Sequence, residues 1–269
     1  MPKIQPPVPI FDNLSYLSNP FKVNHFSAIA CTEKAATIPG SDIDYEYAWK
    51  YLWSYTGSSA TFNAYRREIE RLIQWTWLVN ESSVISLKRE NIEDFVKFCM
   101  KPPASWISKK SVARFKTKNE YRIINPDWRP FVASVSKIDT QLGVPVNKAN
   151  YRPSQASLQS MFSILSSFFN FLIQEEVISS NPVSLIRQKS KYLKAQQHEA
   201  PVRRISNLQW EYVLETIEKL AIDNPKTYER SLFVMNCLYA MYLRISELVW
   251  DERSNPIMGD FQKDRDGNW

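Results

Sequence analysis

The sequence predicts a mainly α-helical protein of two helical units, and three observations lead to this prediction. First, apolar residues recur at the i, i+3 and i+4 spacing of an α-helix in successive segments between 42 and 243. Second, two stretches, 101–152 and 184–204, lack this period and are rich in Lys and Arg. Third, strand-like patterns are confined to a short hairpin near 112–125 and to the last residues of the chain.

The beginning of the first unit is predicted to consist of an arm and three helices. Residues 1–40 are Pro-rich and aperiodic, and we interpret them as an extended N-terminal arm. A first helix is expected over 42–57, with Gly57 as its stop. A second is expected over 58–80, where Ser or Thr would cap it, and a third over 87–100.

The fourth predicted helix, over 154–176, has the clearest pattern. The basic stretch before it is an insertion long enough to suggest a functional role. An aromatic stripe like that of the fourth helix is more typical of a core than of a base-stacking platform. Asn181-Pro182 is predicted to end the unit, so that the first domain covers 41–183 and a polar linker covers 184–204. The apolar residues of the helix follow the helical rule at Leu158, Met161, Phe162, Leu165, Phe168, Phe169 and Leu172.

The second unit, 205–269, is predicted to be an incomplete domain. Ser206 and Gln209 fit a capping box that opens its first helix. A second, buried helix leads into Arg244. The tail has the pattern of a strand, an Asp-Gly turn and the first residues of another strand, so we expect the chain to stop in mid-domain.

Charge is distributed unevenly along the chain. The net charge is +6 and the pI about 9.1. Residues 101–152 hold eleven Lys and Arg against three acids, a net charge of +8, and residues 187–204 hold six against one, a net charge of +5. The remainder therefore carries −7. Localised positive charge is the expected footprint of a polyanion partner, and two solvated loops without a partner would have the same pattern.

Cysteine usage and the N-terminus indicate the cellular compartment. Cys31, Cys99 and Cys237 are scattered and form no CxxC pair, which is typical of a reduced cytosolic protein. The first residues lack the apolar run of a signal peptide, and no stretch approaches the roughly 18 apolar residues of a spanning helix. We therefore expect a soluble, cytoplasmic protein with no membrane partner.

Motifs for nucleotide and metal chemistry are absent from the sequence. The five Gly residues supply no GxxxxGK[ST] loop, and neither HExxH nor a Cys-rich metal spacing occurs. We therefore expect no cofactor and no metal site.

The segment LYAMYLRISELVW, residues 238–250, resembles the region around the first active-site arginine of tyrosine recombinases, the phage integrase family. Those proteins typically have a Gly-Leu-Arg-Ile-Ser-Glu-Leu run after a buried helix, and residues 243–248 match that run in place. Tyr242 occupies the usual Gly position, and Met241 stands where Thr or Ser is usual.

Further segments resemble the same family in the same order. Residues 61–75 and 87–98 are similar to its core-binding helices, 157–183 to the last core-binding helix, and 203–214 to the start of the catalytic domain. The stretch 101–150 is similar to an elaboration in some integrases of mobile genetic elements. The resemblance implies a helical, SAM-like core-binding domain. A basic linker would join it to the first helices and partial β-hairpin of an integrase-type catalytic domain.

The resemblance implies a catalytic role for Arg244. In such enzymes a tyrosine attacks a DNA phosphodiester and becomes covalently linked to it, while two arginines hold the non-bridging oxygens. Arginine suits this task because its planar fork binds two oxygens and stays protonated. Glu247, one helical turn on, would orient or pair Arg244 as a supporting residue. The other interpretation is a salt bridge between Arg244 and Glu247 that merely caps the second unit.

The remaining active-site residues of the family are not found after Arg244. A lysine on a hairpin, a His-x-x-Arg helix, a further His or Trp and the tyrosine nucleophile would follow there in a relative. The chain ends 25 residues after Arg244, no Tyr follows, and its only histidines, His25 and His198, lie upstream. We therefore expect that the chain as given does not cleave DNA.

DNA binding is expected to survive that loss. The core-binding domain and linker would form one half of a C-shaped clamp on double-stranded DNA, and relatives assemble as tetramers on paired sites. Base readout is expected near Ser157, Gln159 and Ser160 of the fourth helix. For any single lysine a solvated surface charge is an equal alternative. Phosphate contacts are expected from Lys189, Lys191, Lys194, Arg203 and Arg204 on the linker, and from Lys109, Lys110, Arg114, Lys116 and Lys118 in the insertion.

Two functions from different classes remain open. The first is site-specific DNA recombination or integration, with this chain as the N-terminal portion of a tyrosine recombinase. The second is a stand-alone DNA-binding remnant or regulator without strand cleavage. Both imply a bacterial, nucleoid-associated protein. A helical scaffold with no DNA partner is a third, more distant alternative.

Overall fold

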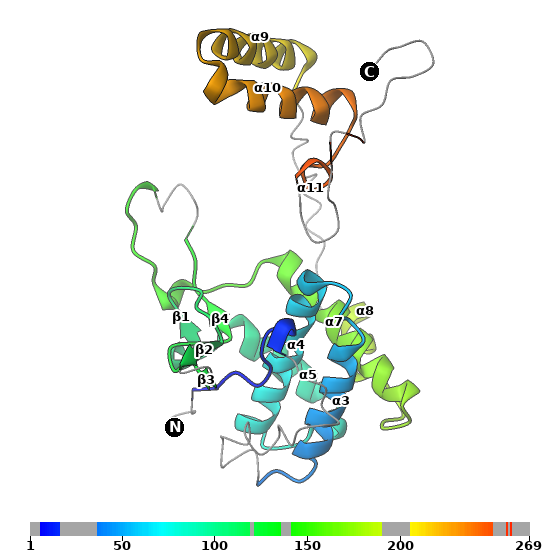
Figure 1. Cartoon of the computed structure of the whole chain (residues 1–269). Helices are drawn as coiled ribbons and strands as arrows, with labels where there is room; N and C mark the ends of the chain where they lie inside the picture. Colours follow the sequence, from blue (N-terminus) through cyan, green and yellow to red (C-terminus); the bar gives the residue numbers. More distant parts are fainter. Residues whose placement is uncertain are drawn as a thin grey trace. The chain divides into compact units, whose positions relative to one another are not determined.

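The computed structural model describes residues 6–16, 37–118, 121–135, 141–189 and 205–249, together with Ile257 and Gly259. The chain divides into two units, Met1–Ala195 and Gln196–Trp269, which are described separately below (Figure 1). Helices dominate the described part of both units, which confirms the prediction of a mainly α protein.

Three helices open the first unit. They are α3 (Ser41–Trp53), α4 (Ser59–Leu78) and α5 (Arg89–Met100). The predicted cap of the second of them is Ser58, whose side chain accepts a hydrogen bond from the backbone N–H of Thr61. This bond satisfies one of the four N–H groups that a helix start leaves without an intrahelical acceptor.

The ends of α3 are defined by two small residues. Gly40 precedes it with φ 86°, and a Cβ at this position would lie 3.1 Å from the hydroxyl oxygen of Ser83, so only glycine fits without strain. The helix ends before its predicted stop at Gly57. At that end the Ser54 hydroxyl donates to the carbonyl oxygen of Tyr51 at 2.6 Å and satisfies one of the last helical acceptors.

A buried carboxylate joins α3 to the turn after α4. Asp44 is 2% exposed and accepts hydrogen bonds from Trp77 Nε1 at 2.9 Å, Ser83 Oγ at 2.6 Å and the backbone N–H of Val84. Burial raises the pKa of Asp44, while these hydrogen bonds oppose the rise. The carboxylate therefore connects three segments of chain inside the core.

The fourth predicted helix is α7 (Gln155–Gln174), capped by Ser154, which accepts from the backbone N–H of Ser157. By length and composition α7 could cross a membrane, but its apolar residues pack against α3, α4 and α8 (Pro182–Lys189) within the first unit. The prediction that its aromatic stripe belongs to a core is confirmed. Its buried residues are Leu158, Met161, Phe162, Ile164, Leu165, Phe168, Phe169 and Leu172.

The first unit continues beyond the predicted end at Asn181-Pro182. The Asn181 side chain accepts from the backbone N–H of Val183 and donates to the carbonyl oxygen of Ser166, and α8 follows directly. Val183 and Ile186 are buried, so the first residues of the predicted linker are helical. Two apolar residues three apart are too few for a visible period, which is why the sequence pattern missed α8. The boundary between the two units lies at 195/196, within the range predicted as a linker.

The insertion between α5 and α7 is packed against the helices. β1 (Ile107–Ser108) pairs in parallel with β4 (Phe131–Val132). The predicted hairpin near 112–125 is confirmed: β2 (Phe115–Lys118) pairs antiparallel with β3 (Tyr121–Ile124). Trp106 is fully buried. Its ring and that of Phe131 belong to the helical core, so the long connection is an anchored lobe of the unit.

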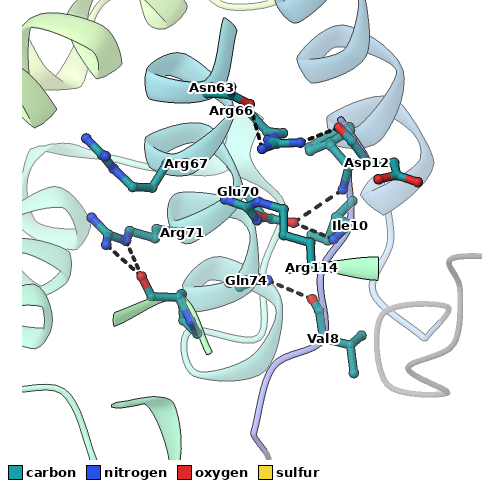
Figure 2. A network of polar contacts seen from close by, with 12 residues as sticks. Val8, Ile10, Asp12, Asn63, Arg66, Arg67, Glu70, Arg71, Gln74 and Arg114 are labelled. Carbon is teal, nitrogen blue, oxygen red and sulfur yellow. Dashed lines mark hydrogen bonds and ion pairs between the residues drawn. The ribbon is translucent and has the colours of Figure 1, made fainter. Parts of the chain in front are cut away.

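The described part of the N-terminal arm, residues 6–16, lies along α4 (Figure 2). Residues 6–10 carry no regular secondary structure, and Leu14–Tyr16 form a single 3-10 turn. Ile10 and Phe11 are 4% and 2% exposed, and the Phe11 ring stacks on that of Tyr45 with centroids 5.4 Å apart. The predicted arm is therefore held against the helices over this range.

A polar stripe on one face of α4 holds this segment, which we call the N-terminal strap (residues 8–12). Gln74 Nε2 donates to the carbonyl oxygen of Val8 at 2.7 Å. The Glu70 carboxylate accepts from the backbone N–H groups of Ile10 and Phe11. One turn earlier Arg66 donates to the carbonyl oxygen of Asp12 (Figure 2). Since the three side chains are four residues apart, they lie along one side of the helix.

The second unit is built on a pair of helices, α9 (Asn207–Asp223) and α10 (Pro225–Ala240), which pack against each other. The predicted capping box is confirmed, because Ser206 Oγ accepts from the N–H of Gln209 while the Gln209 side chain accepts from the N–H of Ser206. Across the pair, the Trp210 and Tyr239 rings stack with centroids 4.8 Å apart.

The prediction that the helix before Arg244 is buried is wrong for the described structure. Within α10 the sole buried residue is Cys237, while Phe233 and Tyr239 are 45% and 52% exposed. The main packing partner of α10 in the described part of the chain is α9, so much of its apolar surface faces outward. The predicted tail hairpin lies outside the described residues, apart from Ile257 and Gly259.

The described cysteines are reduced. Cys99 and Cys237 are free and buried, and burial raises the pKa of the Cys99 thiol. Cys31 lies outside the described residues.

Candidate functional site

The segment that resembles the recombinase motif forms a tight turn and a short helix. After α10 ends, Met241 is its C-cap and Tyr242 takes φ 53°, in the left-handed region. Arg244 is then the N-cap of α11 (Ile245–Leu248). The Tyr242 side chain is 90% exposed, so this backbone conformation is not stabilised by burial of its ring.

Arg244 and Glu247 are close together at the surface. The Glu247 carboxylate accepts from the backbone N–H of Arg244 at 2.7 Å and from its guanidinium at 3.2 Å. The Arg244 side chain is 83% exposed. This geometry fits both interpretations of the sequence, because Glu247 caps α11 and also orients the arginine.

A second candidate site is a cleft of about 620 Å³ in the first unit. It is formed by α4, by the insertion around residues 111–114 and 128–134, and by residues 151–161 at the start of α7. Glu68 contributes a carboxylate to its wall, and Tyr151, Leu158 and Met161 contribute apolar surface. Six arginines line it: Arg66, Arg67, Arg71, Arg114, Arg129 and Arg152. We call this the arginine cleft.

Two of these arginines, Arg71 and Arg114, also fix the insertion to α4. Arg71 donates through Nε and Nη2 to the carbonyl oxygen of Pro130, at 3.0 and 2.6 Å, and its guanidinium lies 4.6 Å from the centre of the Phe131 ring. It shares the Glu68 carboxylate with Arg67, which is 47% exposed. Figure 2 shows Arg67 and Arg71 projecting from the same side of α4.

Arg114 differs from its predicted role as a solvent-facing phosphate contact. Its guanidinium pairs with the buried Glu70 carboxylate and lies 4.7 Å from the centre of the Trp128 ring. The side chain is 12% exposed. The sequence alone did not indicate that Glu70 is buried, because an acidic residue in the middle of a charged helix is expected on its solvent-exposed face. We therefore exclude Arg114 from the residues proposed to contact DNA.

Within the described residues, no carboxylate contacts Arg66, Arg129 or Arg152, so these three arginines retain their positive charge. Arg129 donates to the carbonyl oxygens of Pro126 and Trp128, and Arg152 to that of Tyr151. Burial lowers the pKa of Arg66 to about 10, and the charge of Asp12 partly opposes this. The cleft is therefore a partly desolvated site of positive potential.

The other predicted phosphate contacts of the insertion are at the surface. Lys109, Lys110 and Lys118 are exposed, and Lys118 lies in β2. Lys116 is also exposed and pairs with Asp127 at 3.3 Å. Salt bridges between exposed groups are weak, so this one would yield readily to a phosphate.

The predicted base-reading residues lie on the first turns of α7. Ser157, Gln159 and Ser160 are all exposed. Ser157 also lines the arginine cleft, where its hydroxyl lies 2.8 Å from that of Ser154. Lys189 is the last residue of α8. The remaining predicted linker contacts lie outside the described residues: Lys191, Lys194, Arg203 and Arg204.

Sequence reasoning missed Arg67, Arg129 and Arg152 as members of one site. A signal was present on α4, where Arg67 and Arg71 are four residues apart and lie away from the apolar face. The other two arginines come from segments far apart in the sequence, and only the packing of the insertion brings them to α4.

Comparison of the chain with known protein families, with curated proteins and with solved structures gives no match. Among the residues that the structure describes, no group of three or more His, Cys, Asp or Glu could hold a metal ion.

Proposed function

We propose that this chain binds duplex DNA and serves site-specific recombination of the tyrosine-recombinase type, with Arg244 as a phosphate-holding arginine. The observation that carries the proposal is the turn before Arg244. Tyr242 has φ 53°, a conformation that glycine adopts most easily, and it stands where the recombinase motif has Gly. Tyr242, the one mismatch inside the motif, therefore has a backbone conformation that suits the glycine usual at this position.

The chemistry of Arg244 supports this role. Its guanidinium is at the surface, and among the described residues its one carboxylate contact, with Glu247 at 3.2 Å, leaves it accessible to a second anion. A planar guanidinium can bind two non-bridging phosphate oxygens at once. Donors that meet developing charge in this way typically contribute roughly 10²- to 10³-fold to a rate. Glu247 would hold the arginine in place during that contact.

Electrostatics of the first unit support DNA binding. The exposed lysines Lys109, Lys110, Lys116 and Lys118 come from one lobe, the insertion. Lysines of this kind bind the phosphate backbone and carry little sequence information. Base readout would come from the exposed polar residues on the first turns of α7. A stand-alone DNA-binding protein without cleavage shares these contacts, so duplex binding is the claim to test first.

The test is the salt dependence of duplex binding. Each phosphate contact makes the slope of log K against log salt more negative by about 0.9. These four lysines therefore predict a slope of about −3.6 or steeper. The double variant Lys109→Gln/Lys110→Gln should flatten the slope by about 1.8.

The matched control is Lys219→Gln/Lys226→Gln, which removes the same charge from exposed positions of the second unit. It should leave the slope unchanged. No measurable duplex binding, or binding that is independent of salt, would contradict the proposal. So would an equal effect of the two double variants, because net charge alone would then explain binding.

A further inference from the structure

The arginine cleft has a composition that favours a ligand. Six arginines and the Glu68 carboxylate line a space of about 620 Å³, which is within the range of about 300–1,000 Å³ typical of small-molecule sites. Arg67 and Arg71 share Glu68, and Arg114 pairs with Glu70, so Arg66, Arg129 and Arg152 carry the excess positive charge. A protein gains no stability by collecting like charges in a partly desolvated space. An anion in the cleft would offset that repulsion.

One buried donor of a cleft-lining arginine lacks an acceptor among the described residues. Arg66 is 5% exposed, and its Nε–H has no acceptor among the described residues. The same guanidinium donates through Nη1 and Nη2 to the Asp12 carbonyl and to the side chains of Asn13 and Asn63, so its orientation is fixed. A buried N–H without a partner is destabilising, and an oxygen of a bound anion would satisfy it.

Arg129 and Arg152 supply charge at the edge of the cleft. Both donate to backbone carbonyl oxygens, which position the guanidinium groups without neutralising them. Arginine is the residue best suited to a phosphate, because its fork matches two phosphate oxygens.

The start of α7 adds polar groups of the same kind. Ser154 and Ser157 are among the lining residues, and α7 is 20 residues long. The N-terminus of such a helix carries partial positive charge from its unpaired N–H groups. Phe131, Leu158 and Met161 contribute apolar surface to the cleft lining, which strengthens electrostatic contacts near them.

We propose that the arginine cleft is a phosphate-binding site that takes a pyrophosphate-sized anion on Arg66, Arg129 and Arg152 with the serine hydroxyls of α7. The phosphates come either from a free phosphorylated small molecule or from a nucleic-acid backbone. The residues of this site belong to the first unit, whereas Arg244 belongs to the second.

Calorimetric titration of the full chain with pyrophosphate, in chloride buffer, tests the site. Wild type should show saturable binding. The double variant Arg129→Gln/Arg152→Gln should bind at least about tenfold more weakly, equivalent to about 1.4 kcal/mol. Since both arginines contact only backbone carbonyl oxygens in the described structure, the variant should keep the wild-type melting temperature.

The control Lys97→Gln/Lys101→Gln removes two exposed positive charges of the same unit outside the cleft. Its affinity for pyrophosphate should stay within about twofold of wild type. The absence of saturable binding to wild type would overturn the proposal. Equal weakening by the cleft variant and by the control would also overturn it.

A competition arm identifies the source of the phosphates. Pyrophosphate that displaces a labelled duplex, together with weaker duplex binding by the cleft variant, supports the site and assigns it to the DNA backbone. Pyrophosphate binding that leaves duplex binding unchanged supports the site and assigns it to a free phosphorylated ligand. Because pyrophosphate is titrated alone first, a failure of DNA binding and a failure of the cleft give different results.

Discussion

The substitution Glu70→Gln tests the packing that holds the N-terminal strap and the insertion on α4. Glu70 is 1% exposed and is the acceptor for the backbone N–H groups of Ile10 and Phe11 and for the Arg114 guanidinium. The glutamine oxygen can still accept from the strap, but its amide group cannot pair with Arg114. The substitution therefore leaves a mostly buried charge without its partner.

The magnitude follows from that unpaired charge. Removing one partner of a buried ion pair typically costs about 3–5 kcal/mol, and the retained backbone contacts place Glu70→Gln near the lower end, at about 3 kcal/mol. This is a large part of the roughly 5–15 kcal/mol that stabilises a typical domain. Adding Arg114→Met should restore part of the loss, because the unpaired charge is then gone.

Urea unfolding followed by tryptophan fluorescence is the assay, since six of the nine tryptophans lie in the first unit. The matched control is Glu46→Gln, which removes a carboxylate that is 59% exposed and pairs with Lys50. It should change the free energy of unfolding by less than about 0.5 kcal/mol. A loss below about 1 kcal/mol for Glu70→Gln, or no recovery with Arg114→Met, would refute the reasoning.

Two further predictions concern stability. Tyr242→Gly should leave the melting temperature unchanged or raise it, because relief of about 1 kcal/mol of strain in the left-handed backbone region offsets the extra chain entropy of glycine. Tyr242→Val should lower the melting temperature. A marked fall in the melting temperature of Tyr242→Gly would contradict the left-handed conformation of this residue. The raised pKa of Asp44 means that the folded state holds this proton to higher pH than the unfolded state, so its stabilising contribution is present below pH 3.8 and is lost as pH rises through the raised value. Relative to Asp44→Asn, wild type should therefore lose free energy of unfolding as the pH rises above 3.8, as measured by urea unfolding at each pH. A gain in the stability of wild type relative to Asp44→Asn over this rise in pH would show that the hydrogen bonds from Trp77, Ser83 and Val84 outweigh burial.

Features decided by neighbouring residues could be predicted from the sequence. The caps at Ser58 and Ser206 and the buried aromatic face of α7 depend on residues within one or two turns. The hairpin of β2 and β3 is likewise local.

Features that depend on distant partners could not be predicted. Arg66, Glu70 and Gln74 look like a solvated helix face, and their burial follows from the strap and from Arg114, more than forty residues away. The arginine cleft was invisible for the same reason. The catalytic role of Arg244 was predicted from a motif and stays a prediction. The structure shows that Arg244 is exposed and contacts Glu247.

The most direct measurement of the central claim, that the chain binds duplex DNA, is lysine acetylation footprinting read by mass spectrometry. With duplex present, we predict protection of Lys109, Lys110, Lys116 and Lys118, and also of the predicted linker lysines Lys189, Lys191 and Lys194. Lys219 and Lys226 of the second unit should be modified equally with and without DNA. Equal modification of every lysine in both conditions, or protection confined to Lys219 and Lys226, would contradict the claim.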